Sequence, residues 1–85
     1  MKIEKVTWED SFTDDSENWK ELETLSCRPP TLTSVGVVKE YDDYICVIPH
    51  FSVCAEGTVV CGEIYIPKVA VICRLNLGCL VEENL

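Results

Sequence analysis

The stretch from Tyr44 to Leu77 constrains the fold most strongly, because it holds three apolar runs separated by turn residues. The runs are rich in Val, Ile, Tyr and Cys, which is typical of strands joined as a β-meander. A chain of 85 residues with 47% hydrophobic residues suits one folded domain and is too apolar for a disordered segment. We therefore expect residues 1–85 to form a single small β domain.

Strand-like segments alternate with turn residues along the chain. The strands are expected at residues 3–8, 31–40, 44–51, 58–66 and 68–76, with a turn at 40–44 and a loop at 52–57. Pro49 and Pro67 cannot donate to a ladder, while Gly36 and Gly62 mark a bend or a close backbone approach. These interruptions predict a mainly β fold, a small SH3-like or Sm-like bent barrel of four to five antiparallel strands.

Residues 1–30 form an acidic, aromatic segment that we expect to pack on the barrel. Within it, residues 16–25 suit one short helix, since Trp19, Leu22 and Leu25 recur at a spacing of three. An irregular or extended segment is the alternative, because an isolated helix of this length is marginal in water.

Alternation assigns the faces of the last strand. The inward face receives Val69, Val71, Cys73 and Leu75. The outward face receives Lys68, Ala70, Ile72 and Arg74. Since Tyr65 also falls on an outer face, the outside is more apolar than a soluble monomer needs, and we expect a homo-oligomer or another partner surface.

The six cysteines contain no C-x-x-C pair, which argues against a zinc or disulfide framework. Most of them adjoin aliphatic residues. We expect reduced, mostly buried thiols that pack as small hydrophobes, with disulfides and zinc as the alternatives.

The formal net charge of −8 is concentrated in the first third of the chain. Residues 1–25 carry eight acids against three lysines, whereas residues 44–80 are neutral. Such a chain repels nucleic-acid phosphates and attracts a basic partner surface; solubility alone is the simpler explanation of the acids. No targeting segment or long apolar run is visible, so we expect a cytoplasmic protein that does not enter a membrane.

Short segments spread over residues 6–75 form a pattern. They are Val6-Thr7-Trp8-Glu9-Asp10-Ser11, Trp19, Ser34-Val35-Gly36 and Gly62-Glu63-Ile64-Tyr65-Ile66-Pro67-Lys68. The pattern resembles small phage and prophage accessory proteins with Trp-x-Asp-Ser, Ser-Val-Gly and Ile-Pro-Lys segments. The resemblance implies a small β-barrel made in the cytoplasm of the infected bacterial host, and no particular activity. Phage proteins of this size often counter host antiviral defence.

Nothing in the sequence assembles a catalytic set. His50 is the single histidine, and no Ser-His-Asp set, phosphate loop or metal-ligand spacing occurs. Adjacent acids at Asp14-Asp15 and Asp42-Asp43 lack the geometry that a Mg²⁺ site requires. We expect no enzyme, no cofactor and no metal.

Two binding hypotheses follow. In the first, the oligomer sequesters a nucleotide signal. Lys68, with Arg28 or Arg74, meets phosphate, Trp8 or Tyr65 stacks on the base, and the backbone from Ser34 to Gly36 donates N–H groups. Solvated charge at Lys68 and a barrel-plugging role for Trp8 and Trp19 are the structural alternatives.

In the second hypothesis, the acidic segment grips a host protein or mimics nucleic acid in the groove of a host DNA- or RNA-binding enzyme. Aromatic anchors ringed by charge are typical of binding hot spots. The expected contact residues are Trp8, Phe12, Trp19, Asp14 and Asp15. A small structural or virion subunit is the third possibility.

Overall fold

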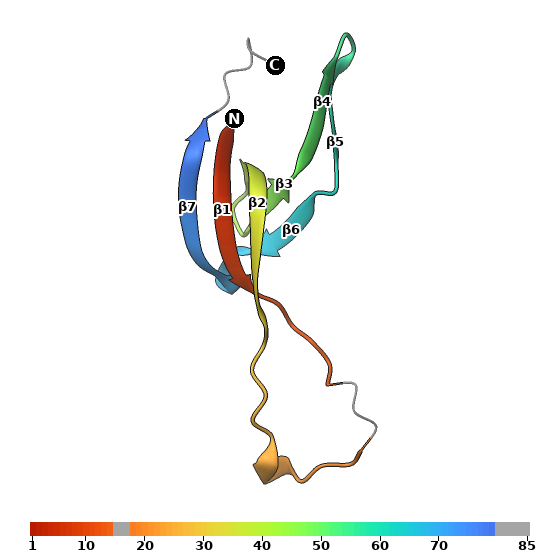
Figure 1. The fold of residues 1–85 in the computed structure, drawn as a ribbon, viewed down its shortest axis with the longest axis vertical. Coiled ribbons are helices and arrows are strands. Elements are labelled where there is room, and N and C mark those ends of the chain that lie inside the picture. The colour runs from red at the N-terminus through yellow and green to blue at the C-terminus, as the bar shows by residue number, and fades with distance from the viewer. Residues whose placement is uncertain (15–17, 80–85) are drawn as a thin grey trace.

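A computed structural model describes residues 1–14 and 18–79 (Figure 1). The described residues are mainly strand, with two single turns of 3-10 helix. The strands are β1 (Lys2–Glu9), β2 (Thr31–Glu40), β3 (Tyr44–Ile48), β4 (His50–Cys54), β5 (Gly57–Cys61), β6 (Ile64–Pro67) and β7 (Val71–Cys79). The 3-10 turns are η1 (Leu22–Thr24) and η2 (Lys68–Ala70). The predicted mainly β class is confirmed.

Five strands form one antiparallel sheet in the order β6-β3-β2-β1-β7, and β4 pairs with β5 in a separate two-stranded sheet. The turn η2 links β6 and β7, so the chain passes from one edge of the sheet to the other within a few residues. Figure 1 shows two projections from this sheet, the β4–β5 hairpin and the long loop between β1 and β2.

Gly36 lies where β2 meets the end of β3, and its lack of a side chain is required there. A Cβ atom at this position would lie 2.4 Å from the carbonyl oxygen of Ile48. The close backbone approach expected at Gly36 is therefore confirmed.

Pro49 and Gly62 each divide one of the predicted strands. Pro49 separates β3 from β4, and Gly62, whose φ of +76° favours glycine, lies between β5 and β6. The predicted loop over 52–57 is wrong in extent. Pairing continues to Cys54 opposite Gly57 and leaves a tight turn, because Gly57 adopts a φ of +130°.

The predicted helix over residues 16–25 is wrong for the part that the structure describes. Residues 18–25 contain only the 3-10 turn η1, and its residues are all exposed. The Trp19, Leu22 and Leu25 side chains have no surface to bury against, so the apolar spacing supplies no packing energy to hold a helix.

The predicted faces of the last strand hold for Val71, which packs against the core, and for Ile72, which is exposed, but they are wrong for Arg74. Residues 68–70 form η2, and Val69, expected to face inward, is 98% exposed. A register shift places Val71 opposite Trp8 but Arg74 opposite Val6, so Arg74 shares the inner face with the core. Strict alternation could not reveal this bulge, which adds one residue between two inward positions.

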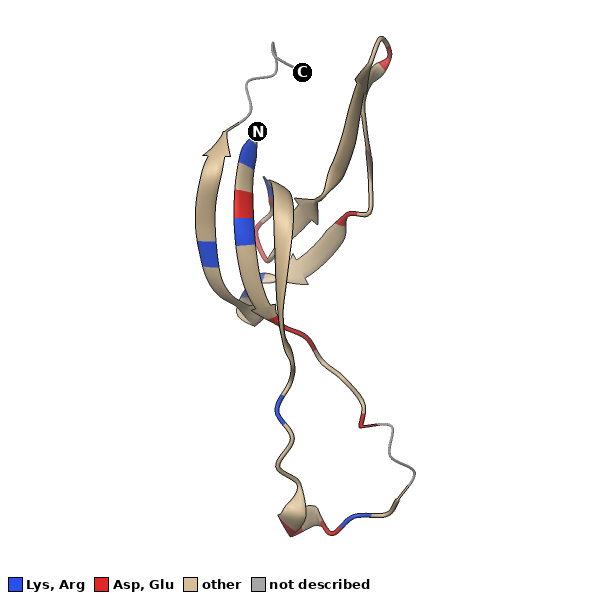
Figure 2. Cartoon of the chain, viewed as in Figure 1, with Lys and Arg blue, Asp and Glu red and all other residues tan. Residues whose placement is uncertain are grey.

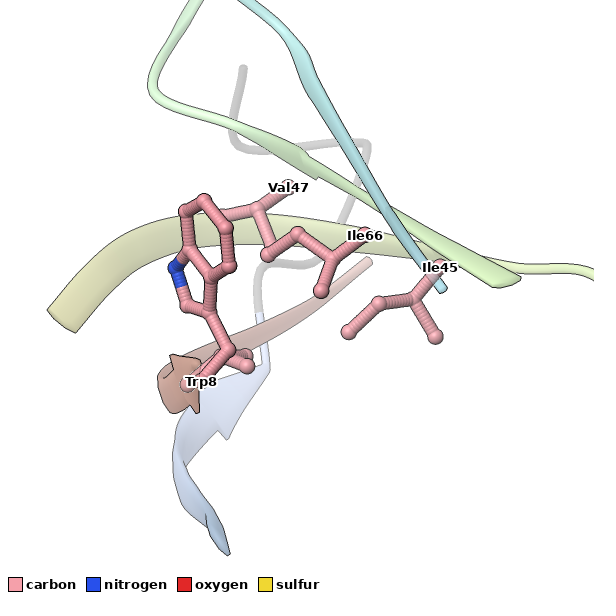
Figure 3. Close-up of a cluster of buried hydrophobic side chains, with 5 residues drawn as sticks. Trp8, Ile45, Val47 and Ile66 are labelled. Carbon is pink, nitrogen blue, oxygen red and sulfur yellow. The ribbon is translucent and has the colours of Figure 1, made fainter. Parts of the chain in front are cut away.

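The core lies on the inner face of the sheet, where β1 meets β3 and β6 (Figure 3). Its buried members are Val6, Trp8, Ile45, Val47 and Ile66, with Val38, Ile64, Ala70 and Val71 packed against them. Burial of one such side chain stabilises the fold by about 1.5–3 kcal/mol.

The expectation of mostly buried thiols is wrong. Cys46 is buried, whereas the other five cysteines are exposed. None of the six forms a disulfide. Cys61, Cys73 and Cys79 adjoin aliphatic residues in sequence, but they lie on the hairpin and on an edge strand, where no second layer covers them.

Candidate partner-binding surface

The loop between β1 and β2, residues 10–30, is the first candidate surface, and we call it the arm. The Asp10 N–H donates to the Pro30 carbonyl at 3.0 Å and closes the arm at its base. From there the arm extends away from the sheet (Figure 1), in a molecule whose longest dimension is 58 Å.

The arm exposes large apolar side chains without a layer to cover them. Trp19 is fully exposed (102%), and Phe12, Leu22 and Leu25 are also exposed. Phe12 and Leu25 line a hollow of ≈ 600 Å³, and the Lys20 ammonium pairs with the Asp14 carboxylate at 2.9 Å beside it. An exposed tryptophan with nearby apolar groups is the composition of a protein-binding surface.

Acids dominate the charge of the arm (Figure 2). Its described acids are Asp10, Asp14, Glu21 and Glu23 against Lys20 and Arg28. Arg28 lies 3.8 Å from the Glu9 carboxylate, where it neutralises one further acid. The arm therefore presents aromatic and aliphatic groups in a negative field.

The predicted partner-contact residues do not all lie on the arm. Phe12, Asp14 and Trp19 do, and Asp15 lies outside the described residues. Trp8 belongs to β1 and is 7% exposed, with its indole N–H donating to Ser34 Oγ at 3.0 Å.

The predicted nucleotide-binding residues are only partly brought together. Trp8 and Ser34 meet through that hydrogen bond, and Gly36 lies against the Ile48 carbonyl. Tyr65 precedes Ile66, which is in the core, so its ring lies on the opposite face of the sheet. Lys68 lies directly after β6, at the start of η2, where it pairs with Glu40.

Arg74 and Lys68, two of the residues predicted to bind phosphate, instead pair with carboxylates in a charged network on the inner face. Arg74 donates from Nε and Nη2 to the Glu4 carboxylate at 2.7 and 2.8 Å. Its Nη2 and Nη1 groups also donate to Glu40, at 2.8 and 3.3 Å. Lys68 Nζ approaches the second Glu40 oxygen at 2.8 Å. The network joins β7 to β1 and β2.

The network shifts the acidity of its carboxylates. Hydrogen bonds from Arg74 and then from Lys68 lower the pKa of Glu40 to about 2. The Arg74 hydrogen bond also lowers the pKa of Glu4, although burial opposes that shift. Both carboxylates are ionised at neutral pH, so they neutralise Arg74 and Lys68.

Sequence reasoning missed a cluster of tyrosines on the outer face. The Tyr41 and Tyr44 rings stack with centroids 4.5 Å apart, and the Tyr65 ring lies 6.1 Å from that of Tyr44. Together with Asp43 and Pro67 we call this the tyrosine surface. The sequence alone carries no signal for this cluster, because Tyr44 and Tyr65 come together only through the pairing of β3 with β6, which sets Tyr44 opposite Pro67 and Cys46 opposite Tyr65.

Two features are absent from residues 1–14 and 18–79. No group of three or more His, Cys, Asp or Glu side chains there could hold a metal ion. No helix in the same part of the chain has the length and apolar character needed to cross a membrane.

Comparison of the chain with family models, with curated proteins and with solved structures gives no match in any of the three. The geometry of the arm, the inner-face network and the tyrosine surface is therefore the basis for the assignment of a function.

Proposed function

We propose that this protein is a non-enzymatic accessory protein of the phage type that grips a basic surface of a bacterial host protein with its arm and blocks it. The expected target is a component of an antiviral defence system in the host cytoplasm. The observation that carries the proposal is the full exposure of Trp19 on a projecting, acidic loop.

Exposure of this kind is costly unless a partner covers the ring. A tryptophan side chain buries 150–250 Å² when packed, which makes it a strong anchor in an interface. The acids around it favour encounter with a basic surface and disfavour other acidic proteins. An enzyme that binds DNA or RNA offers such a surface, so nucleic-acid mimicry is one form of the same mechanism.

We propose that an SH3-like barrel is the scaffold that holds the arm. The strand order β6-β3-β2-β1-β7 and the short η2 connection between the edge strands support this proposal. A curved sheet of this kind fixes both ends of the arm on neighbouring strands, β1 and β2.

Sequestration of a nucleotide signal is the second candidate, and it has less support. Lys68 and Arg74 both pair with carboxylates, and Trp8 is buried. Phosphate would have to displace Glu40 from Lys68 before it could bind there. A role as a structural or virion subunit is the third candidate, supported only by the exposed apolar surface.

Capture of a basic host protein tests the proposal. A pull-down from bacterial lysate at low salt compares the wild-type chain with Trp19→Ser and with Val69→Ser, a matched change of an equally exposed apolar residue outside the arm. We expect Trp19→Ser to weaken the affinity for the captured protein at least tenfold, which corresponds to about 1.4 kcal/mol or more. Val69→Ser should leave that affinity unchanged.

Two results would contradict the proposal. One is equal capture by the two variants. The other is retention of a cyclic or ADP-ribose-type nucleotide by the purified chain, detected by native mass spectrometry, with loss of that nucleotide in Lys68→Ala; this result would promote the second candidate.

We also propose that the protein is a homo-oligomer that associates through the β4–β5 hairpin. Phe51 is paired with Val60, and Val53 with Thr58, so their side chains share one face, which we call the hairpin face. Val53 and Val60 are exposed, and an isolated two-stranded hairpin is marginally stable in water. A second copy is the favoured cover because the hairpin carries only one acid, Glu56, so two hairpins meet without strong charge repulsion.

A further inference from the structure

The tyrosine surface is a built concavity that the arm does not use. Asp43, Tyr44, Tyr65 and Pro67 line a hollow of ≈ 490 Å³ on the outer face of β3 and β6. The positions are fixed by the sheet, since Tyr44 pairs with Pro67 across the two strands. The Lys68 N–H donates to the Asp43 carbonyl at 2.9 Å and holds the turn against η2.

The aromatic faces of this surface are available to a ligand. Tyr44 is 39% exposed and Tyr65 is 59% exposed. Their rings are in tilted contact, with centroids 6.1 Å apart and planes at 58°, so together they form one aromatic side of the hollow. Cys46, partial desolvation and Glu63 raise the pKa of Tyr65 above its ordinary value, so no anionic phenolate forms there at physiological pH.

The chemistry of the lining favours a cation. The face of an aromatic ring is negative, and a carboxylate beside it adds a full charge. The cluster already holds one cation in this way, because Lys39 Nζ lies 5.5 Å from the centroid of the Tyr41 ring. Tyr41 is thus occupied by Lys39 and stacked on Tyr44, while Tyr65 and Asp43 border the open hollow.

We infer that this hollow binds an arginine side chain of a partner protein, with the guanidinium stacked on the exposed face of the Tyr65 ring and hydrogen-bonded to the Asp43 carboxylate. A planar guanidinium stacks on aromatic faces and is more weakly hydrated than an ammonium, so it suits a shallow site of this kind better than lysine does. The net charge of −8 favours the approach of a basic segment. The site shares no residue with the arm, so a failed test of one surface does not contradict the proposal for the other.

NMR titration of the full chain with Nα-acetyl-arginine-N-methylamide tests the inference. We expect saturable shifts of the Asp43, Tyr44 and Lys68 amides at ligand concentrations up to roughly 100 mM, as suits a single cation–π contact. The citrulline analogue, which has nearly the same shape and no charge, serves as the matched ligand and is expected to give no saturable shift.

Two substitutions of Tyr65 distinguish stacking on the aromatic ring from attraction to the net negative charge of the chain. Tyr65→Phe keeps the ring face and retains binding within about twofold, whereas Tyr65→Leu removes the face and weakens binding at least fivefold. The inference is overturned by equal shifts with citrulline, by equal binding of the Phe and Leu variants, by shifts confined to the arm, or by no shift at all. A lysine analogue that binds more tightly than the arginine analogue would overturn the choice of guanidinium.

Discussion

The arm and the β4–β5 hairpin both project from the same sheet, and they differ in charge and in backbone hydrogen bonding. The arm is a long acidic loop around Trp19, closed at its base by one backbone hydrogen bond. The hairpin is a regular ladder of five paired positions with a nearly neutral sequence. Both elements are exposed, but their charges differ. The acidic arm suits a basic protein, and the nearly neutral hairpin suits a second copy of the chain.

Neither projection holds the fold together, so the largest effect is expected away from both. Arg74→Met removes the partner of Glu4, which is 7% exposed, and leaves that carboxylate buried and unpaired. Breaking a buried pair costs about 3–5 kcal/mol, and partial exposure of Arg74 reduces the expected loss to about 3 kcal/mol. Urea unfolding measures the change.

Lys68→Met is the control for that measurement. It removes only the contact with Glu40, whose side chain is half-exposed, so we expect a loss below about 1 kcal/mol. Equal losses in the two variants would show that the inner-face network does not depend on the burial of Glu4.

A charge introduced on the hairpin face is expected to weaken self-association without affecting the arm. Val60→Glu places a carboxylate beside Phe51 in the proposed contact between copies. We expect the dissociation constant of the oligomer to rise at least tenfold, about 1.4 kcal/mol or more. Light scattering or native mass spectrometry measures the mass, and Trp19→Ser should leave it unchanged. A wild-type chain that is monomeric at all concentrations refutes the hairpin contact.

Salt concentration distinguishes the partner contact of the arm from the self-contact of the hairpin, because only the first is expected to weaken as salt rises. Screening weakens attraction between the acidic arm and a basic partner, by about tenfold from 50 to 300 mM salt. The same salt screens repulsion between two chains of charge −8, so self-association strengthens or stays constant. Binding and mass measured in one salt series distinguish the two. Parallel responses would show that one surface serves both contacts.

The smallest effect is expected from pH. The folded pKa of Glu40 is about 2, below its ordinary value of 4.5, and that of Glu4 is also lowered. A depressed carboxylate pKa stabilises the fold above pH 4.5, and this contribution is lost as the pH falls from 4.5 toward 2. Solvent screens Glu40, so we expect a loss of about 1 kcal/mol or less from it. Thermal melts at pH 5.5, 4 and 3 measure the change, and Glu40→Gln should flatten it; a wild-type melt that does not change with pH would exclude the linkage.

Glycine and proline positions allowed the strand breaks and one close backbone approach to be predicted. Gly36, Pro49 and Gly62 mark positions where a side chain or an N–H cannot be accommodated, and the backbone follows those limits whatever surrounds it. The second strand was predicted with its observed bounds, Thr31–Glu40. The extent of the hairpin was not, because strand and loop residues there have similar local preferences.

The candidate surfaces could be predicted less completely. Phe12, Asp14 and Trp19 were identified from composition, and they are near one another in sequence. Trp8 was grouped with them but belongs to the core, and the tyrosine surface was missed. Its members come from a turn and two strands, so they meet only once the register of β3 and β6 is set.

The sequence by itself determined the β class, the breaks between strands and the acidic, aromatic character of the arm, since these depend on local backbone limits and on composition. Only the tertiary structure decided that Arg74 points inward to Glu4, that Trp8 and Trp19 have opposite environments, and that three tyrosines form one surface. The physical reason is that a single bulge, or the register of one strand pair, changes which side chains share a face, and neither is written in local sequence preference.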